Sequence, residues 1–427
     1  MKAILTALLL GLTASVHAAA DKPATAGKPN IIFILADDYG IPGVGCYGGA
    51  FKTPNLDKLA ATGIRFEYCY AAPVCAPSRA LAMFGRYAFR TGVTGNKRGG
   101  MASPDKEVCI AKTMKTAGYA TAIAGKWGQL SYFTTQEDGA RWGWDEFMTW
   151  GVGSDGRGNR YWDPNYNKNG QPLTGGKDKF GPDLLHEFVV DFIRRHRDGP
   201  FFVYYPTTLI HDKLMPTPDS KSGAQSLGAD NIAYMDKLVG KLVAELEALK
   251  LREKTLIIFS GDNGCKGTQT INGRPVDGHK AVFNEGGSRV PLIANCSGFV
   301  PAGKVCADLV DFSDFYATFA ELAGAKLPEG VTLDSHSFAP QLRGEKGTPR
   351  EWVYVQLDAD RYVRDARWKL TGDGKLFDMA DAPFAEKPAT DEAARNRLQA
   401  VLDKLNPAPA PPGKKQAKTE RKSAKQP

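Results

Sequence analysis

The chain has 427 residues, of which 42% are hydrophobic and 24% are charged, so its composition is that of an ordinary globular protein. This length is ample for a large core and fits either one big α/β unit or two domains. The formal net charge is +8, but Lys2 and a basic C-terminal tail carry most of it and leave about +2 on the body of the chain. That small excess gives no support for nucleic acid as a substrate.

Both ends of the chain have the composition of segments outside a fold. Residues 1–20 contain Lys2, an apolar run over 3–12 and small residues at the end, which is typical of a signal peptide. The apolar run is too short to span a bilayer, and no later segment replaces it. We therefore expect an exported protein, secreted or periplasmic, with no membrane span. Residues 406–427 are rich in proline and then in lysine, which predicts a disordered basic tail.

Predicted strands and helices alternate along most of the chain. Apolar runs predict buried strands at 31–36, 119–124, 201–205, 256–260 and 290–294. Helical periodicity and helix-ending signals predict helices at 53–63, 113–117, 184–195 and 232–250. This alternation favours an α/β fold with a large, mostly parallel sheet flanked by helices.

The pattern changes after Arg350. Short strands are predicted at hairpin-like intervals, at 352–357, 362–364, 368–370 and 376–378, and a helix follows at 391–405. These elements predict a small C-terminal α+β subdomain. We place the main domain at 28–345 and the subdomain at 346–405.

Charged side chains follow several of the predicted buried strands. They are Asp37, Asp38, Lys126, His211 and Asp262. Ligands of such sheets bind beyond the carboxyl ends of the strands, so these side chains are expected to converge there. Buried carboxylates need a counter-charge, which a hard cation would supply. A capped turn is the simpler explanation of the Asp pair and remains open.

The stretch around Cys75 reads as the start of a helix. Pro77 suits a first helical turn, and apolar residues then recur at helical spacing and should face the core, namely Leu81, Phe84, Ala88 and Phe89. Cys75 would then lie just ahead of a helix N-terminus, a place that favours a thiolate, a sulfate or a phosphate. The alternative is a structural cysteine, for example bridged to Cys69; the pairing of the other cysteines stays open.

Residues 142–162 are dense in aromatic residues and glycine, with Arg157, Arg160 and Asp163 close by. This composition suits a loop that lines a polar ligand pocket, because aromatic rings offer apolar faces to sugars or aryl groups. A packed insertion fits equally well.

The segment Cys75-Ala76-Pro77-Ser78-Arg79 resembles the C-x-P-S-R segment of the sulfatases, members of the alkaline phosphatase superfamily, in which the cysteine is oxidised to formylglycine. Further family segments occur in the family's order over roughly residues 28–380. They are Asp37-Asp38, Gly125-Lys126-Trp127, His211 with Pro216 after it, Asp262-Asn263-Gly264, and Lys280 with Glu285-Gly286-Gly287. Their common order argues against chance.

The resemblance implies an arylsulfatase-like enzyme whose catalytic domain is 28–345. It implies calcium held by Asp37, Asp38, Asp262, Asn263 and the formylglycine made from Cys75, whose diol attacks the sulfur of a sulfate ester. Arg79, Lys126 and Lys280 would stabilise charge on the sulfuryl oxygens, and His211, with Lys280, would protonate the leaving alcohol. The implied partners are a sulfated small molecule or polysaccharide and a formylglycine-generating maturation enzyme.

One position departs from the family pattern. Many members have a histidine two residues after the lysine of G-K-W, where this chain has Gly128 followed by Gln129. Gln129 is a hypothetical replacement that forms hydrogen bonds but accepts no proton at neutral pH. Two alternatives stay open: a phosphonate or phosphodiester hydrolase of the same superfamily, and an inactive relative that binds sulfated polymers.

Overall fold

The computed structural model describes residues 27–96, 102–127, 133–150, 159–173, 176–221 and 226–405. Its centre is a ten-stranded sheet. In spatial order the strands are β12 (Lys304–Asp311), β2 (Ile64–Tyr70), β11 (Arg289–Asn295), β8 (Thr255–Gly261), β1 (Asn30–Ala36), β7 (Phe201–Tyr205), β3 (Ala120–Lys126), β4 (Glu146–Trp150), β5 (Tyr166–Lys168) and β6 (Gln171–Pro172).

The middle of this sheet is parallel. β1 pairs in parallel with β7 and β8, and β3 pairs in parallel with β7 and β4. β11 is antiparallel to both β8 and β2, whereas the edge strand β12 is parallel to β2. Because β1, β8, β7 and β3 all run the same way, their carboxyl ends share one edge of the sheet.

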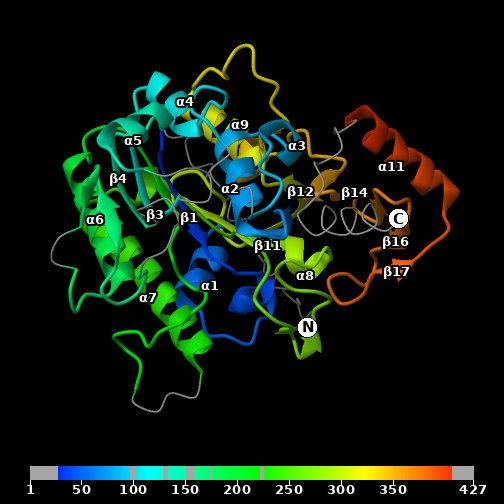
Figure 1. Ribbon diagram of the computed structural model, residues 1–427, viewed down its shortest axis with the longest axis horizontal. Coiled ribbons are helices and arrows are strands. Elements are labelled where there is room, and N and C mark those ends of the chain that lie inside the picture. Colours follow the sequence, from blue (N-terminus) through cyan, green and yellow to red (C-terminus); the bar gives the residue numbers. More distant parts are fainter. Residues whose placement is uncertain are drawn as a thin grey trace, which may run out of the picture.

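Helices cover both faces of the sheet. α2 (Cys75–Phe84), α4 (Ile110–Thr116) and α9 (Asp314–Ala323) contribute to the hydrophobic cluster on one face, and α1 (Pro54–Ala61), α6 (Gly181–Arg195) and α7 (Leu227–Ala248) to the cluster on the other (Figure 1). β1 divides its side chains accordingly: Ile31, Phe33 and Leu35 join the first cluster, and Ile32 and Ile34 the second. Every β1 residue is buried, as expected of a strand covered on both sides.

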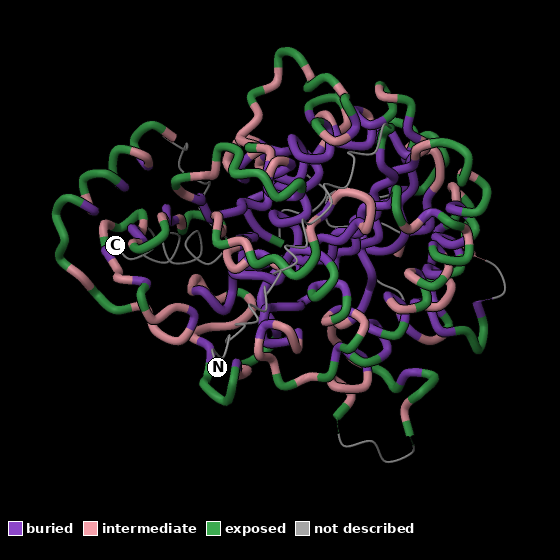
Figure 2. Tube along the Cα trace, turned by 180° about the vertical axis from the view of Figure 1, so that it is seen from behind, coloured by how far each residue is buried: buried purple, intermediate pink, exposed green. Residues whose placement is uncertain are grey.

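Figure 2 shows the buried residues concentrated in the interior of the molecule and the exposed ones at its periphery. The shorter elements are α3 (Ala88–Thr91), α5 (Gln136–Trp142), α8 (Glu285–Ser288), α10 (Ala339–Leu342) and a two-stranded sheet of β9 (Thr270–Ile271) and β10 (Arg274–Pro275). Of the helices in the described residues, none combines the length and apolar composition needed to cross a bilayer.

A second, antiparallel sheet follows near the C-terminus. Its strands are β13 (Val353–Leu357), β14 (Asp360–Arg364), β15 (Trp368–Thr371), β16 (Leu376–Asp378) and β17 (Lys387–Pro388), and α11 (Glu392–Leu405) packs against β14 and β15. The predicted fold class, a mostly parallel sheet flanked by helices with a small α+β part, is therefore confirmed. The exact boundaries at 28–345 and 346–405 stay predictions.

Several local expectations were wrong. The helical run after Cys75 is broken, because Gly85 adopts φ 63° and ends α2 before α3 begins at Ala88. For residues 142–162, the alternative of a packed insertion fits the described part, since β4 lies within them and Trp142 and Trp144 are core residues. β2, β12 and α9 were not predicted at all.

Some expectations cannot be compared with the structure. The predicted signal peptide (1–20), the predicted tail (406–427), and Gly128 and Gln129 lie outside the described residues.

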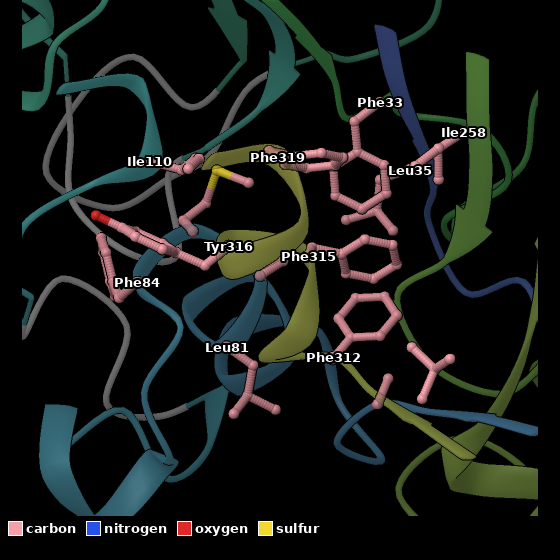
Figure 3. Close-up of a cluster of buried hydrophobic side chains, with 14 of the residues drawn as sticks. Phe33, Leu35, Leu81, Phe84, Ile110, Ile258, Phe312, Phe315, Tyr316 and Phe319 are labelled. Carbon is pink, nitrogen blue, oxygen red and sulfur yellow. The ribbon is translucent and has the colours of Figure 1, made fainter. Parts of the chain in front are cut away.

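α9 packs a group of aromatic side chains under the sheet (Figure 3). The ring centroid of Phe315 lies 4.6 Å from that of Phe33, 5.0 Å from that of Phe312 and 5.6 Å from that of Phe338. Phe315 is fully buried. This helix therefore anchors one helical layer to β1 itself.

Phe315→Ala should lower the free energy of unfolding by about 3–5 kcal/mol, because it removes a fully buried ring and leaves a cavity. Urea denaturation followed by circular dichroism measures this loss. Leu327→Ala, at a half-exposed position near the end of α9, is the control and should change stability by less than about 0.5 kcal/mol. A loss of under about 1 kcal/mol for Phe315→Ala would contradict the importance of this contact.

Candidate active site

The residues predicted from the sequence lie together at the carboxyl edge of the central strands. They come from separate elements: Asp37 and Asp38 follow β1, Lys126 ends β3, His211 follows β7, Asp262 and Asn263 follow β8, Cys75 and Arg79 lie on α2, and Lys280 precedes α8. Direct contacts between side chains link these elements. The geometry thus brings the candidate residues to one place, and their chemical roles stay predictions.

Two glycines let the backbone segments at this edge approach one another. A Cβ atom at Gly261 would lie 1.7 Å from the carbonyl oxygen of Tyr39, and one at Gly264 would lie 1.8 Å from that of Gly286. Because such distances are impossible for a real side chain, only glycine fits at both positions. The Asp262 amide donates to the carbonyl of Ala36 at 3.0 Å, so β1 and β8 stay aligned up to their acidic ends.

Buried ion pairs hold the centre of the site. The Lys126 ammonium donates to both carboxylate oxygens of Asp37, at 2.7 and 2.9 Å. The Arg79 guanidinium donates to one oxygen of Asp262 at 2.7 and 3.1 Å, and to the carbonyl of Lys126 at 2.8 Å. All four side chains are buried. Each charge is therefore compensated inside the protein, as burial of ions requires.

The Asp37 carboxylate is held in its charged form. Burial by itself would raise its pKa, but the positive charges of Lys126, Arg79 and Lys280 outweigh burial and keep the pKa of Asp37 well below its usual range. An Asp that stays ionised in the interior is suited to bind a cation.

Cys75 is the first residue of α2 and is fully buried. Its Sγ lies 3.5 Å from an oxygen of Asp37, from an oxygen of Asp38 and from the Lys280 ammonium. The sequence pattern favoured an anion at this helix start, but burial, and then the Asp262 carboxylate, raise the pKa of the Cys75 thiol well above its ordinary value. Of the anions that this helix start favours, burial therefore disfavours a thiolate of Cys75 itself.

The alternative of a bridge between Cys75 and Cys69 is wrong. All seven cysteines are free thiols in this structure, and each of them lies in a described part of the chain. Cys75 is therefore a buried thiol at the focus of the charged residues rather than half of a disulfide.

The acidic side chains form a candidate metal site. One ligand atom from each of four residues lies within 4.8 Å of the others; these residues are Asp37, Asp38, Cys75 and His211. The amide oxygen of Asn263 is buried and accepts no hydrogen bond, while its amide nitrogen donates to Asp38 at 3.1 Å. An orphaned amide oxygen beside several carboxylates fits a hard divalent cation, which prefers oxygen ligands.

His211 and Lys280 face this centre from its outer side. The His211 Nε2 atom lies 4.0 Å from an Asp38 carboxylate oxygen. Burial, more than any neighbouring charge, lowers the pKa of His211 to about 4, so the imidazole is neutral at pH 7. Lys280 pairs with Asp38, and although burial opposes its charge, the Asp38 and Asp37 carboxylates raise its pKa above the ordinary value.

The segment that carries Lys280 is fixed by the C-terminal sheet. Glu285 is buried, accepts a hydrogen bond from Tyr70 at 3.0 Å and forms an ion pair with Arg364 of β14 at 3.2 Å. Lys369 of β15 donates to the carbonyl of Phe283 at 3.0 Å. The Glu285 backbone amide in turn donates to Glu386 at 3.0 Å. The second sheet thus positions the Lys280 segment.

Sequence reasoning assigned no part in the site to Arg364, Lys369 or Glu386. They lie in short strands and a connecting loop that look like ordinary surface segments. The signal available was that basic residues stand beside apolar ones in the predicted strands. Arg364 follows Val363 and Lys369 lies between Trp368 and Leu370, so burial of these strands requires a partner for each charge.

The comparisons with known proteins agree with this geometry. The family model named Sulfatase matches residues 29–325. Human arylsulfatase A is 33% identical over 404 residues, which cover 86% of this chain and 76% of that protein. The N-acetylgalactosamine-6-sulfatase of Canis lupus familiaris is 30% identical over 405 residues, which cover 85% of this chain and 74% of that protein.

Among solved structures, that of Ps i-CgsB in complex with k-i-k-neocarrahexaose is similar, with a TM-score of 0.76 and 28% identity over 89% of this chain and 92% of the other. The fold and the site define a sulfuric ester hydrolase with an alkaline phosphatase-like architecture. The chain belongs to the sulfatase family.

Arg364→Met should lower the free energy of unfolding by about 3 kcal/mol, because it removes the closer of the two ion-pair partners of the buried Glu285 carboxylate and leaves only Arg289, at 3.7 Å. Arg367→Met is the matched control: its guanidinium is 58% exposed and pairs with Asp378 on the surface, so the loss should stay below about 1 kcal/mol. Urea denaturation measures the free energy of unfolding of both variants. Equal losses would contradict a larger contribution of the buried Arg364–Glu285 pair.

Proposed function

We propose that this sulfatase hydrolyses the sulfate ester of a carbohydrate or aryl substrate with a formylglycine made from Cys75 and a bound calcium ion. The observation that carries the proposal is the position of Cys75. Its buried Sγ atom lies 3.5 Å from Asp37, Asp38 and Lys280 alike, at the point where the acidic and the basic side chains meet. A reactive group made there would be close to a cation and to positive charge at once.

The donor set supports calcium as the metal. Asp37, Asp38 and Asp262 supply carboxylates, and Asn263 supplies the buried amide oxygen without a hydrogen bond. Formylglycine would supply an oxygen nucleophile to this site, and calcium would supply positive charge beside it. The residues present fit both groups.

The basic side chains have distinct parts in this proposal. Arg79 is committed to Asp262 and to the carbonyl of Lys126, so it holds both in position. Lys126 carries its ammonium in the buried centre of the site and Lys280 at its outer side, and both would stabilise negative charge on the sulfuryl oxygens. Lys126 pairs with Asp37 and Lys280 pairs with the adjacent Asp38, so the two ammonium groups reach the same small volume.

His211 is the proposed proton donor to the leaving alcohol, with help from Lys280. Because its imidazole is neutral in the unliganded protein, this role requires that the negative charge of the bound substrate favour the protonated form. His211 lies at the outer side of the centre, where a leaving group would depart, and it is mostly buried. The charged Lys280 ammonium raises the local positive potential and supports departure of an alkoxide oxygen. Gln129 stays the hypothetical replacement for the missing histidine at Gly128.

The named relatives support a sulfated carbohydrate as the substrate. One of them is called N-acetylgalactosamine-6-sulfatase, and Ps i-CgsB was solved with k-i-k-neocarrahexaose. Arylsulfatase A supports aryl sulfates as assay substrates. We further propose export, secreted or periplasmic, from the pattern of residues 1–20, and a formylglycine-generating maturation enzyme as a partner of the chain.

The protein produced with a formylglycine-generating enzyme should hydrolyse 4-nitrophenyl sulfate in preference to methyl 4-nitrophenyl phosphate. Peptide mass spectrometry should find the aldehyde, or its hydrate, at Cys75. Cys75→Ala should lower kcat by at least about 1,000-fold, because it removes the nucleophile. Preference for the phosphodiester would favour the phosphodiester hydrolase, and an unmodified thiol after co-production would favour an inactive binder of sulfated polymers.

Calcium should stabilise the fold. At a concentration about 100 times its Kd, calcium should add about 2.7 kcal/mol to the free energy of unfolding, because it binds only the folded state. Thermal unfolding with and without calcium, compared with magnesium, measures this. Asp37→Asn should remove the response, and Asp105→Asn, an exposed carboxylate paired with Arg141, should keep it. A calcium shift that survives in Asp37→Asn would contradict this site.

A further inference from the structure

One cation lies against the site without belonging to the proposed machinery. The guanidinium of Arg160 contacts the Nδ1 atom of His211. His211 Nδ1 also lies 2.6 Å from the carbonyl oxygen of Asp212, so Arg160 approaches a histidine already fixed by its own loop. The following inference rests on the proposed function, because it places the leaving group of a sulfate ester at His211.

The backbone around Arg160 is pinned to the loop that carries His211. The Tyr161 hydroxyl donates to the carbonyl of His211 at 2.6 Å, and the Trp162 indole donates to the carbonyl of Pro216 at 2.7 Å. The carbonyl of Arg160 accepts a hydrogen bond from the Tyr166 hydroxyl at 2.7 Å. These hydrogen bonds hold the backbone of Arg160 in a fixed position beside the site.

The side chain of Arg160 is fixed as well. Its guanidinium carbon lies 4.2 Å from the centroid of the Trp150 ring, so the group stacks on the indole. Trp150 ends β4 and is the register partner of Lys126 on β3. Lys126, Trp150 and Arg160 thus lie at the same edge of the sheet, with Lys126 in the centre of the site and Arg160 beyond His211.

Arg160 differs from the other cations near the site in its charge balance. Arg79 pairs with Asp262, Lys126 with Asp37 and Lys280 with Asp38. Lys266, on the loop after β8, pairs with Asp212. Among the residues that the structure describes, no carboxylate pairs with Arg160, although the residue is half-buried. A stacked guanidinium uses its face and keeps its N–H edge for an oxyanion.

The position of Arg160 beside His211 determines which part of a bound substrate it contacts. The oxygen of the leaving group must lie within hydrogen-bond reach of His211 to receive a proton. The sugar carried by that oxygen then lies next to the neighbour of His211, which is Arg160. The contact is made by the leaving group and not by the sulfate that is hydrolysed.

The geometry points to Arg160 as a specificity-determining residue that binds a second oxyanion on the leaving sugar. The substrate class is then a polyanionic saccharide with a carboxylate or a further sulfate near the scissile ester. Both groups present planar or tripodal oxygens that a guanidinium binds through paired N–H donors. A uronate and a second sulfate are the two sources of such an oxyanion.

The test compares three sugars on the converted enzyme: N-acetylgalactosamine 6-sulfate, N-acetylgalactosamine 4,6-disulfate, and glucuronate linked to N-acetylgalactosamine 6-sulfate. The parent should prefer at least one of the two polyanionic sugars, and the preferred arm identifies the source. Arg160→Gln should lower kcat/KM for that sugar by about 10- to 100-fold, the loss expected for charged hydrogen bonds, and for the monosulfate by less than about threefold.

Two matched variants separate the oxyanion contact from other effects. Lys266→Gln removes one positive charge from the neighbouring loop and should leave the ratio between the sugars unchanged. Arg160→Lys keeps the charge without the paired donors and should lose part of the preference. Equal losses of Arg160→Gln on all three sugars would mean that Arg160 acts only through His211, and no preference in the parent would equally overturn the inference.

A binding measurement keeps this result apart from the proposed function. In Cys75→Ala protein, which cannot turn over substrate, calorimetry should find tighter binding of the preferred polyanionic sugar than of the monosulfate. Adding Arg160→Gln should remove that difference. If the converted enzyme hydrolyses no sulfate ester, the proposed function fails, and the calorimetric difference still decides whether Arg160 binds a second oxyanion. If calorimetry finds no difference in affinity between the two sugars, the inference is overturned.

Discussion

The pairing of buried carboxylates with buried cations is the constraint on which the rest of the site depends. Lys126 neutralises Asp37 and Arg79 neutralises Asp262, all of them out of contact with water. Charges in such a place are tolerated only when each has a partner within hydrogen-bond distance. The parallel arrangement of β1, β3 and β8 meets this requirement, since it delivers residues distant in sequence to one edge.

The part of the molecule that could be predicted is the part in which local pattern and tertiary environment agree. The apolar run of β1, followed by Asp37, predicted both a strand buried on two faces and a polar site at its end. β12 was missed because its first half is exposed at the sheet edge and carries no apolar run. Gly85, by contrast, was a visible helix-ending signal that the helical spacing of its neighbours obscured.

Within the site, the sequence indicated which residue types gather but not how they are supported. The state of Cys75 depends on burial, which disfavours the thiolate that a helix start alone would favour. The contacts of Arg364 and Lys369 link two sheets whose relative position no local pattern encodes. The proposed role of Arg160 likewise depends on a tertiary contact, the one with His211, which no local sequence pattern indicates.

The complete burial of Cys75 sets the order of events under the proposed conversion to formylglycine. A modifying enzyme has to bind the peptide around this side chain, and the folded protein offers no exposed atom of it. The proposed conversion would therefore take place on the unfolded polypeptide, before α2 docks at the sheet edge. On this proposal a molecule that folds first stays a thiol, and the active fraction of a preparation reflects how conversion competed with folding.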